Sequence, residues 1–417
     1  MRDIEPAPRP YLMKNKVQHY AWGQKGRQSY IADFLGLTTD ADAPHAEIWM
    51  GTHPNGPSDI ITDSHRLSLA QLIERDPERI LGRNVAHEFS NSLPFLFKIL
   101  SAGEPLSIQA HPDRHQARLL HQNDPAHYPD SNHKPELAVA LDSLDALLGF
   151  KNLEGIRETF RRTPELFQWI EGEEWETMIT TNAPISMIDE EILLKKMYQS
   201  ILKAAIDAPE QLIQTNQRIK NRLENEKKHL TTQERLFMDL EPRYTSKDIG
   251  LLMIFLLQMI HLEKGEAIAI PPGIPHAYLK GNIIECMANS DNVVRAGLTP
   301  KFRDTNTLID ILDYRPPENP VITGGNDEND YTYPTPFNEF QITRMSLIKG
   351  EDRIIPFPSA PRIMLVTAGH LQLKWREGES VNAISLKRGM SVFVPACVDT
   401  LNMIADHNAE VYLASVP

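Results

Sequence analysis

The sequence predicts a mainly β protein with an α-helical insertion, because successive stretches of the chain differ in their pattern of apolar and polar residues. Residues 17–150 alternate short apolar runs with Pro, Gly, Asn and Asp, as strands and turns do. Residues 151–245 carry apolar side chains at helical spacing, and strand-like runs return at 263–271 and beyond 338. At 417 residues the chain exceeds what one hydrophobic core usually organises, so two or three domains are expected, with the helical segment inserted in a β domain.

Short strands and two helical interruptions are expected in the first segment. Residues 107–111 alternate polar and apolar side chains and end at Pro112, as a half-buried strand does. The helical interruptions are residues 67–74 and 115–121. The candidate strands are residues 47–51, 94–100, 106–111 and 136–141.

The helical segment is recognised by Leu212, Ile219, Leu223 and Leu230, which recur on one face while Lys, Glu and Asn fill the other. The charged run at residues 221–228 is therefore expected to be a solvated helix face and not a binding patch.

The C-terminal segment begins with linker-like composition. Residues 313–338 are dense in Pro, Gly, Asn and Asp. Five candidate strands separated by turns then predict a second, small β-sandwich. They are residues 363–367, 369–375, 383–386, 391–395 and 411–415.

Composition narrows the class of protein. The chain has 417 residues, 41% of them hydrophobic, and a net charge of −13, which argues against nucleic acid as the main partner. Cys286 and Cys397 are too few for a disulfide framework, and the N-terminus lacks the apolar core of a signal peptide, so a cytoplasmic location is expected. The longest apolar run, residues 249–260, is too short to span a membrane and is expected to be a buried core element.

Four separated residues are candidate metal ligands. Gln109 and His111 should share one face of a strand, since residues i and i+2 point the same way. Glu136 follows a Lys-Pro pair, and His276 follows a Pro/Gly turn that ends a strand. Two imidazoles, a carboxylate and an amide oxygen suit Zn²⁺, with Fe²⁺ or Mn²⁺ as alternatives. A chance Gln-x-His pair on the surface or in the core is the competing interpretation.

A shared metal would have a consequence for domain organisation. Glu136 and His276 lie on opposite sides of the helical segment, so the β domain that holds them must be discontinuous in sequence. We expect a catalytic domain from residues 1–150 and 246–315, a helical insertion at 151–245, and a C-terminal domain at 316–417.

Two glycine-strand-proline stretches, residues 265–271 and 389–395, resemble the strand edge of a cupin jelly roll. A catalytic cupin domain and a second C-terminal jelly roll are therefore expected. Asp399 and Thr400 follow the second stretch, with no Gln-x-His pair upstream, so the C-terminal jelly roll is expected to be metal-free. Gln109 departs from the His-x-His that cupins usually have.

Longer motifs resemble the type I phosphomannose isomerases. The two principal stretches are residues 128–137 (YPDSNHKPEL) and 276–301, with supporting blocks at 20–23, 46–54 and 93–98. The resemblance covers residues from about 17 to 304. It implies one Zn²⁺ held by Gln109, His111, Glu136 and His276, and interconversion of mannose 6-phosphate and fructose 6-phosphate through an enediol-type intermediate.

Five charged residues in these motifs are catalytic or cationic candidates. Arg295 can donate two planar hydrogen bonds to phosphate or enediolate, and Lys301 supplies a compact charge. Lys134 shares a strand face with Glu136 if the intervening Pro leaves the strand extended, which makes it an acid/base candidate. Either Glu285 or Asp291 is the base or orients Arg295, and Glu285 is favoured.

The remaining candidates concern substrate contacts. Ser107 shares its strand face with the metal ligands and, with Lys98, is a candidate phosphate contact; an ordinary exposed lysine is the alternative for Lys98. Tyr278 should line the pocket. His53 is open to a structural or a catalytic role, with the structural one favoured.

Three other functions remain as alternatives. A cupin dioxygenase would use similar ligands on Fe²⁺ and require oxygen, and a sugar-sensing cupin would bind sugar phosphate without turnover. A bifunctional isomerase-nucleotidyltransferase is disfavoured, since no Gly-rich nucleotide loop is present. The expected partner is a small sugar phosphate, with no nucleic acid and no membrane, and the expected state is a monomer.

Overall fold

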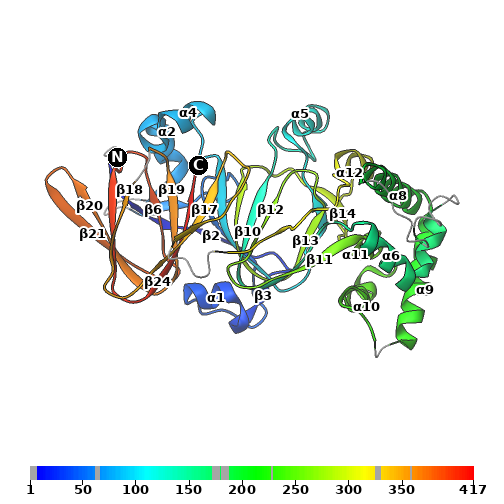
Figure 1. The fold of residues 1–417 in the computed structure, drawn as a ribbon. Helices are drawn as coiled ribbons and strands as arrows, with labels where there is room; N and C mark the ends of the chain where they lie inside the picture. Colours follow the sequence, from blue (N-terminus) through cyan, green and yellow to red (C-terminus); the bar gives the residue numbers. More distant parts are fainter. Residues whose placement is uncertain are drawn as a thin grey trace.

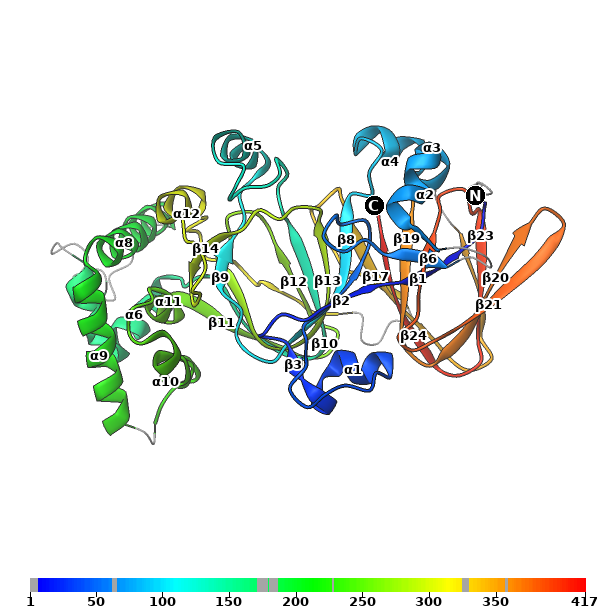
Figure 2. The ribbon, with the colours of Figure 1, turned by 180° about the vertical axis from the view of Figure 1, so that it is seen from behind.

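The computed structural model describes residues 7–61, 66–170, 179, 187–226, 229–324, 330–356 and 359–417. The molecule is elongated: two β regions lie side by side, and a group of helices covers the far end of one of them (Figure 1). Seen from behind, α6, α8, α9, α10 and α11 remain grouped at that end, and β20 and β21 lie at the opposite end (Figure 2).

The first β region is an antiparallel sheet curled into a barrel. Its strand order is β15-β12-β10-β13-β8-β5-β2, with β11 on β10 and with β9 joining β13 to β14. The strands are β2 (Lys16–Gln18), β5 (Glu47–Met50), β8 (Phe95–Ala102), β9 (Ile108–Ala110), β10 (Glu136–Phe150), β11 (Leu257–Leu262), β12 (Ala267–Ile270), β13 (His276–Ala288), β14 (Val294–Gly297) and β15 (Val321–Ile322). The strands expected around residues 47–51, 94–100, 106–111 and 136–141 are thus confirmed, with shifted ends.

Side-chain alternation divides the barrel into an interior and an exterior. On β8, Leu100 and Ala102 belong to a buried cluster with Ala138 and Ala140 of β10, while Phe97 packs into the core between the two β regions. Every residue of β8 is buried, because both faces of this strand are covered. By parity Glu136 shares the interior face with Ala138 and Ala140.

Helices fill the segment between β10 and β11. They are α6 (Leu153–Arg162), η2 (Pro164–Trp169), α8 (Met187–Asp207), α9 (Pro209–Asn225), α10 (Thr232–Tyr244) and α11 (Gly250–Leu256). Leu212, Ile219 and Leu223 are buried as predicted, and Leu230 is partly buried against the same core. The apolar run 249–260 is divided between the buried α11, a helix beyond the expected boundary of the insertion, and the first part of β11, in which residues 258–259 are half-buried. Asn221 and Glu224 are exposed as predicted, and residues 227–228 lie outside the described residues.

The second β region is a jelly roll of two facing sheets. One has the order β16-β17-β24-β19-β22-β1-β6-β7 and the other β18-β23-β20-β21. The C-terminal strands are β16 (Asp330–Thr332), β17 (Gln341–Leu347), β18 (Asp352–Pro356), β19 (Arg362–Ala368), β20 (His370–Glu377), β21 (Ser380–Lys387), β22 (Ser391–Val394), β23 (Thr400–Ala405) and β24 (Ala409–Ser415). All five candidate strands are present, and β16, β17, β18 and β23 are additional.

Three N-terminal strands complete this second region. They are β1 (Tyr11–Lys14), β6 (Asp59–Ile61) and β7 (Arg66–Ser68). Tyr11 pairs with Phe393 of β22, and β1 pairs with β6 on its other edge. This pairing was not predicted, because partners so far apart in sequence leave no local signal. The expected linker at 313–338 contains β15 and β16, and residues 325–329 lie outside the described residues.

The two glycine-strand-proline stretches adopt the same turn. Gly265 precedes β12 with φ +85°, and Gly389 precedes β22 with φ +87°. A Cβ at Gly389 would lie 2.6 Å from the backbone oxygen of Phe34, so this position requires glycine for its φ and for space. The sequence echo therefore reflects a shared structural element of the two β regions.

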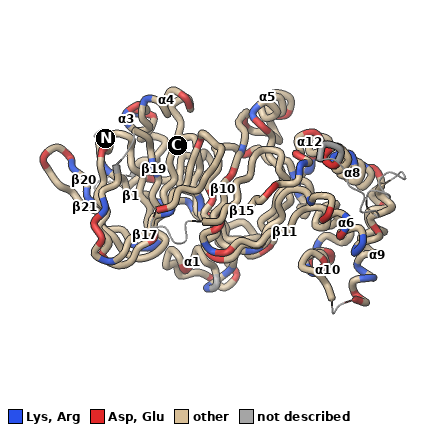
Figure 3. The backbone as a smooth tube through the Cα atoms, in the orientation of Figure 1, with Lys and Arg blue, Asp and Glu red and all other residues tan. Residues whose placement is uncertain are grey.

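Shorter elements lie along the edges of the two β regions and beside the helical group (Figure 1). They are η1 (Gly26–Gln28), α1 (Tyr30–Leu35), α2 (Leu69–Arg75), α3 (Pro77–Leu81), α4 (Arg83–Glu88), α5 (Arg114–Asn123), α12 (Thr305–Ile311), β3 (Gln24–Lys25) and β4 (Pro44–His45). The helices expected at 67–74 and 115–121 correspond to α2 and α5. Acidic and basic residues are interspersed along the chain (Figure 3). Among the described residues, no helix has the length and apolar character needed to cross a membrane.

Candidate metal centre

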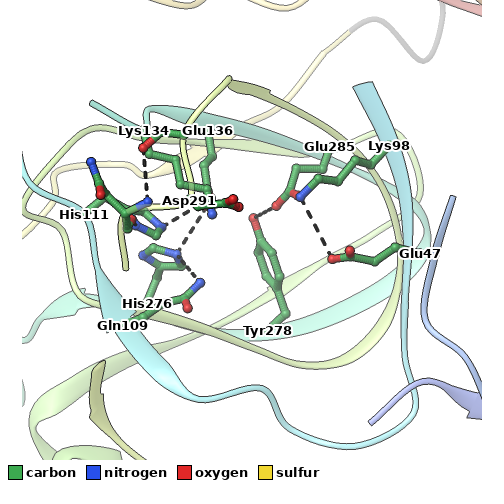
Figure 4. Close-up of polar contacts among 12 residues, drawn as sticks. Glu47, Lys98, Gln109, His111, Lys134, Glu136, His276, Tyr278, Glu285 and Asp291 are labelled. Carbon is green, nitrogen blue, oxygen red and sulfur yellow. Dashed lines mark hydrogen bonds and ion pairs between the residues drawn. The ribbon is translucent and has the colours of Figure 1, made fainter. Parts of the chain in front are cut away.

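His111, Glu136 and His276 converge inside the barrel. One ligand atom from each lies within 4.8 Å of the others, and all three side chains are buried. Glu136 Oε1 is 3.3 Å from His111 Nε2, and Glu136 Oε2 is 3.3 Å from His276 Nε2. Figure 4 shows the three side chains pointing toward one another. This spacing leaves room for a cation that all three groups could bind.

The strand ends bring these ligands together. Glu136 begins β10, His276 begins β13, and His111 directly follows β9. Gln109 on β9 is the direct strand partner of His276, and its amide nitrogen lies 3.5 Å from His276 Nε2. Because an amide can turn over to exchange its oxygen and nitrogen, Gln109 can present its oxygen to the same point. The four candidate ligands are therefore neighbours in space.

Backbone carbonyls orient both imidazoles. His111 Nδ1 donates to the Asn292 carbonyl at 2.8 Å, and His276 Nδ1 donates to the Ile274 carbonyl at 2.9 Å. Each ring is thereby held with Nε2 toward the centre, as second-shell partners of metal-binding histidines do. Burial lowers the pKa of His111 to about 4 despite the opposing Glu136 charge, so this imidazole is neutral at pH 7.

Two polar atoms at the centre make no hydrogen bond of good geometry within the described part of the chain. Among the described residues, neither His111 Nε2 nor Glu136 Oε2 has a hydrogen-bond partner. Burial favours the neutral acid, but the Lys134 charge outweighs it and holds the pKa of Glu136 well below its usual range. A buried carboxylate, the neutral His111 imidazole and the His276 imidazole fit a divalent cation, because a buried unpaired polar atom is otherwise costly.

Two cationic candidates flank the cluster. Lys134 Nζ lies 3.3 Å from Glu136 Oε1, and the Lys134 side chain is almost buried. Arg295 on β14 is the direct strand partner of Gln109, so both side chains leave the same face of the sheet. Arg295 is half-buried and lines a surface pocket with Tyr128, Phe302 and Asp304. Both cations are thus close to the metal ligands.

A second polar group lies beside the cluster in the barrel. Lys98 Nζ donates to Glu285 Oε2 at 3.0 Å, and the Tyr278 hydroxyl donates to Glu285 Oε1 at 3.0 Å (Figure 4). Glu47 lies 4.0 Å from Lys98 Nζ and accepts a hydrogen bond from Trp49 Nε1. Lys98 is only 6% exposed, so the alternative of an ordinary surface lysine is wrong.

Burial and charge set the pKa values of this group. Burial favours the neutral amine of Lys98, but the carboxylates of Glu285 and Glu47 outweigh it and raise the Lys98 pKa. Burial also raises the pKa of Glu285, against the opposing charge of Lys98. Burial and the Glu285 charge raise the pKa of Tyr278 well above its usual value. Lys98 and Tyr278 therefore stay protonated at neutral pH.

The other candidates lie nearer the surface. Asp291 Oδ1 is 3.1 Å from Nε2 of the buried His53, and its other oxygen accepts from Asn55. That contact holds the pKa of Asp291 below its usual range. Ser107 is half-buried just before β9, and Lys301 is exposed. Glu285 and Asp291 thus have partners other than Arg295.

Sequence reasoning missed the role of Asn292. This fully buried side chain donates to the Asp130 and Asn132 carbonyls and to Asp130 Oδ1, while the backbone carbonyl of Asn292 orients His111. It joins the two long motifs, since Asp130 and Asn132 belong to one and Asn292 to the other. Asn132 and Asn292 were visible in the two motifs, but the contact between them was not.

A cupin barrel with a buried His/Glu/His cluster, an adjacent amide and flanking cations defines a metal-dependent enzyme of the cupin class. A family model, the catalytic domain of type I phosphomannose isomerase, matches residues 11–153. Mannose-6-phosphate isomerase 2 of Arabidopsis thaliana is 36% identical, over 92% of this chain and 88% of its own. Mannose-6-phosphate isomerase of Macaca fascicularis is 36% identical, over 94% of each. The chain belongs to the type I phosphomannose isomerase family.

Solved structures agree with this assignment. A mutant phosphomannose isomerase from Salmonella typhimurium has a TM-score of 0.82 at 27% identity, over 97% of this chain and 98% of that one. A mannose 6-phosphate isomerase bound with zinc and yttrium has a TM-score of 0.82 at 26% identity, with the same coverage. The resemblance and the fold class inferred from the sequence are confirmed.

Proposed function

We propose that this protein interconverts mannose 6-phosphate and fructose 6-phosphate with one Zn²⁺ per chain, held by Gln109, His111, Glu136 and His276. Family membership supports the substrate pair. The main support for a bound metal is the buried cluster, in which His111 Nε2 and Glu136 Oε2 lack hydrogen-bond partners among the described residues. Zn²⁺ is proposed because a carboxylate, two imidazoles and an amide oxygen suit it, and because a structural relative binds zinc.

The reaction moves a hydrogen between C2 and C1 of an open-chain sugar. An enediol-type intermediate requires a group that takes the C2 proton, a group that returns a proton at C1, and stabilisation of negative oxygen. Zn²⁺, when bound, supplies a Lewis acid for the sugar's carbonyl and hydroxyl oxygens. The remaining tasks fall to side chains of this chain.

We assign proton transfer to Lys134, with Glu285 and Asp291 as the other acid/base candidates. Lys134 Nζ lies beside the metal cluster, whereas both Glu285 oxygens already accept hydrogen bonds from Lys98 and Tyr278. Asp291 is the more accessible of the two carboxylates, with its side chain 40% exposed. Arg295 is assigned to the developing negative charge, since it is the strand partner of Gln109 and lines an open pocket.

Four residues are proposed to contact substrate. Ser107 and Lys301 are proposed to contact the phosphate, because Ser107 adjoins the ligand-bearing strand and the Lys301 ammonium is exposed. Lys98 and Tyr278 are proposed to line the interior wall of the sugar site, since their polar atoms are held by Glu285. The wall would therefore be rigid.

One assay tests the proposed function. Purified protein of measured zinc content is incubated with mannose 6-phosphate, and fructose 6-phosphate is followed before and after chelation. Product that appears only with zinc supports the proposal, and absence of product from zinc-loaded protein contradicts it. Oxygen-dependent product would favour the cupin dioxygenase, and tight binding without turnover would favour the sugar sensor.

We also propose a cytoplasmic monomer and the domain division at 1–150 with 246–315, 151–245 and 316–417. Strands β1, β6 and β7 of the first segment are an exception, because they pair within the second β region. Two free thiols, Cys286 and Cys397, are compatible with a reducing compartment. The helices between β10 and β11 support a separate insertion. Light scattering of the purified protein tests the monomer.

A further inference from the structure

Glu339 connects the C-terminal part of the chain to the segments that carry two metal ligands. It lies just before β17, between Phe337 and Phe340, whose rings pack in the core shared by the two β regions. Its side chain is only 5% exposed. Oε1 accepts from Arg114 Nη2 at 2.5 Å and lies 2.6 Å from His133 Nε2. One buried carboxylate thus binds two donors from the catalytic β region.

The two donors have matching positions relative to the metal ligands. Arg114 opens α5, three residues after His111, and His133 lies three residues before Glu136. Arg114 Nη2 and His133 Nε2 are themselves 2.9 Å apart. Glu339 therefore joins the segment that follows one ligand to the segment that precedes another.

The contact joins a guanidinium and an imidazole to a buried carboxylate. Burial favours the neutral acid, but the His133 and Arg114 contacts outweigh it and hold the pKa of Glu339 below its usual range. A charge-assisted hydrogen bond to a buried carboxylate is short and directional. If the carboxylate were lost, Arg114 would be free to turn toward solvent, since its side chain is half-exposed, and His133 would lose this acceptor.

We propose that Glu339 is a positioning residue of the metal centre. It fixes the distance between the His111 and Glu136 segments, and the C-terminal jelly roll thereby contributes to zinc retention. The inference rests on the zinc site of the proposed function. Glu339 itself touches neither metal nor substrate, so it acts only through the chain segments that Arg114 and His133 belong to.

The test compares two chemically identical substitutions. Glu339→Gln removes the charge at the proposed position. Glu234→Gln is the matched control, because Glu234 is equally buried, pairs with Arg162 at 2.8 Å, and lies in α10 of the helical segment. Both variants lose a buried carboxylate–arginine pair, but only one of those pairs adjoins the ligand segments.

The main readout is zinc release, which does not depend on turnover. Zinc-loaded wild type and both variants are mixed with a chromophoric chelator. We expect Glu339→Gln to release zinc about tenfold faster than wild type, at the lower end of the effect of outer-shell partners. Glu234→Gln should release zinc at the wild-type rate. Arg114→Ala, a surface change that keeps the His133 contact, should accelerate zinc release less than Glu339→Gln does. It replaces Glu339→Gln in the test if that variant fails to fold.

The outcomes separate this inference from the function on which it rests. Equal zinc release by Glu339→Gln, Arg114→Ala and wild type overturns the positioning role and leaves the metal centre intact. Equal acceleration in Glu339→Gln and Glu234→Gln overturns it too, since the effect would then follow general stability. A wild type that binds no zinc overturns the proposed metal centre itself, and the positioning role with it.

Discussion

Lys98 and Glu285 are direct partners in the β8–β13 register, and their charged groups lie 3.0 Å apart inside the barrel. Lys98 is 6% exposed and Glu285 is 2% exposed. The ammonium also faces Glu47 at 4.0 Å and the Trp49 ring at 5.6 Å. If Lys98 moved away from Glu285, the Glu285 carboxylate would remain buried without its cation, which is unfavourable. The pair should therefore hold both side chains in place and make the site rigid.

Breaking this pair should destabilise the protein. Lys98→Met leaves Glu285 with the Tyr278 hydrogen bond alone, and loss of one partner of a buried ion pair costs about 3 kcal/mol or more. Adding Glu285→Gln should recover part of that loss, because the unpaired charge is then removed. Urea unfolding of the two variants measures both effects. A loss below about 0.5 kcal/mol for Lys98→Met would contradict the importance of the pair.

Metal binding and catalysis should separate at two residues. His276→Ala removes a ligand and should abolish both zinc content and turnover. Arg295→Ala should keep zinc, because Arg295 is not among the ligands, but lose about a hundredfold or more in kcat as an electrostatic stabiliser. Elemental analysis and the isomerase assay measure the two properties on the same samples. Near wild-type kcat in Arg295→Ala would refute its placement at the developing charge.

A substitution at Gly389 tests the shared turn of the two β regions. Gly389→Ala places a Cβ 2.6 Å from the Phe34 carbonyl oxygen at φ +87°. Gly350 is the matched control, since its φ is +84° and nothing lies within 4 Å of an added Cβ. Both alanines carry left-handed strain of about 1–2 kcal/mol, and only Gly389→Ala adds a backbone clash. Thermal unfolding should therefore show a clearly larger loss for Gly389→Ala, and equal losses would contradict the contact.

The sequence predicted local features of this site better than its long-range ones. Gln109 and His111 could be paired from strand alternation alone, because the two are neighbours on one face. Their union with Glu136 and His276 depended on family resemblance, since each lies on a different strand. The sequence could not decide whether Lys98 is buried, because its partner Glu285 lies on another strand.

The same limit explains what was missed in the fold. Strands 47–51 and 94–100 were recognisable from their own residues. The pairing of β1 with β22 was not, because Tyr11 and Phe393 meet only after the whole chain has folded. The contact of Glu339 with His133 is of the same kind, since 206 residues separate the partners.

Stability of the helical segment should depend on pH through Glu234. Burial raises the pKa of Glu234, but hydrogen bonds from Arg162 and Thr231 outweigh it and hold this pKa below its usual value. A lowered folded-state pKa stabilises the fold above the unfolded-state pKa, and this contribution is lost as the pH falls through the folded-state pKa. Glu234→Gln should thus be less stable than wild type by about 1.5 kcal/mol at pH 7. The difference should vanish at acid pH in urea titrations, and a constant difference from pH 7 to pH 2 would contradict the ionised pair.

Removal of the metal should destabilise the barrel itself. Without a cation, Glu136 and His111 keep buried polar atoms that have no hydrogen-bond partner among the described residues, which is unfavourable. Zinc at a free concentration about a hundredfold above its Kd should stabilise the folded state by about 2.7 kcal/mol. Wild-type protein should therefore show a lower Tm after chelation and recover it with zinc. The His276→Ala variant, which lacks a ligand, should show a much smaller response. A wild-type Tm that is unchanged by chelation, with complete zinc removal verified by elemental analysis, would contradict the coupling between this cluster and the fold.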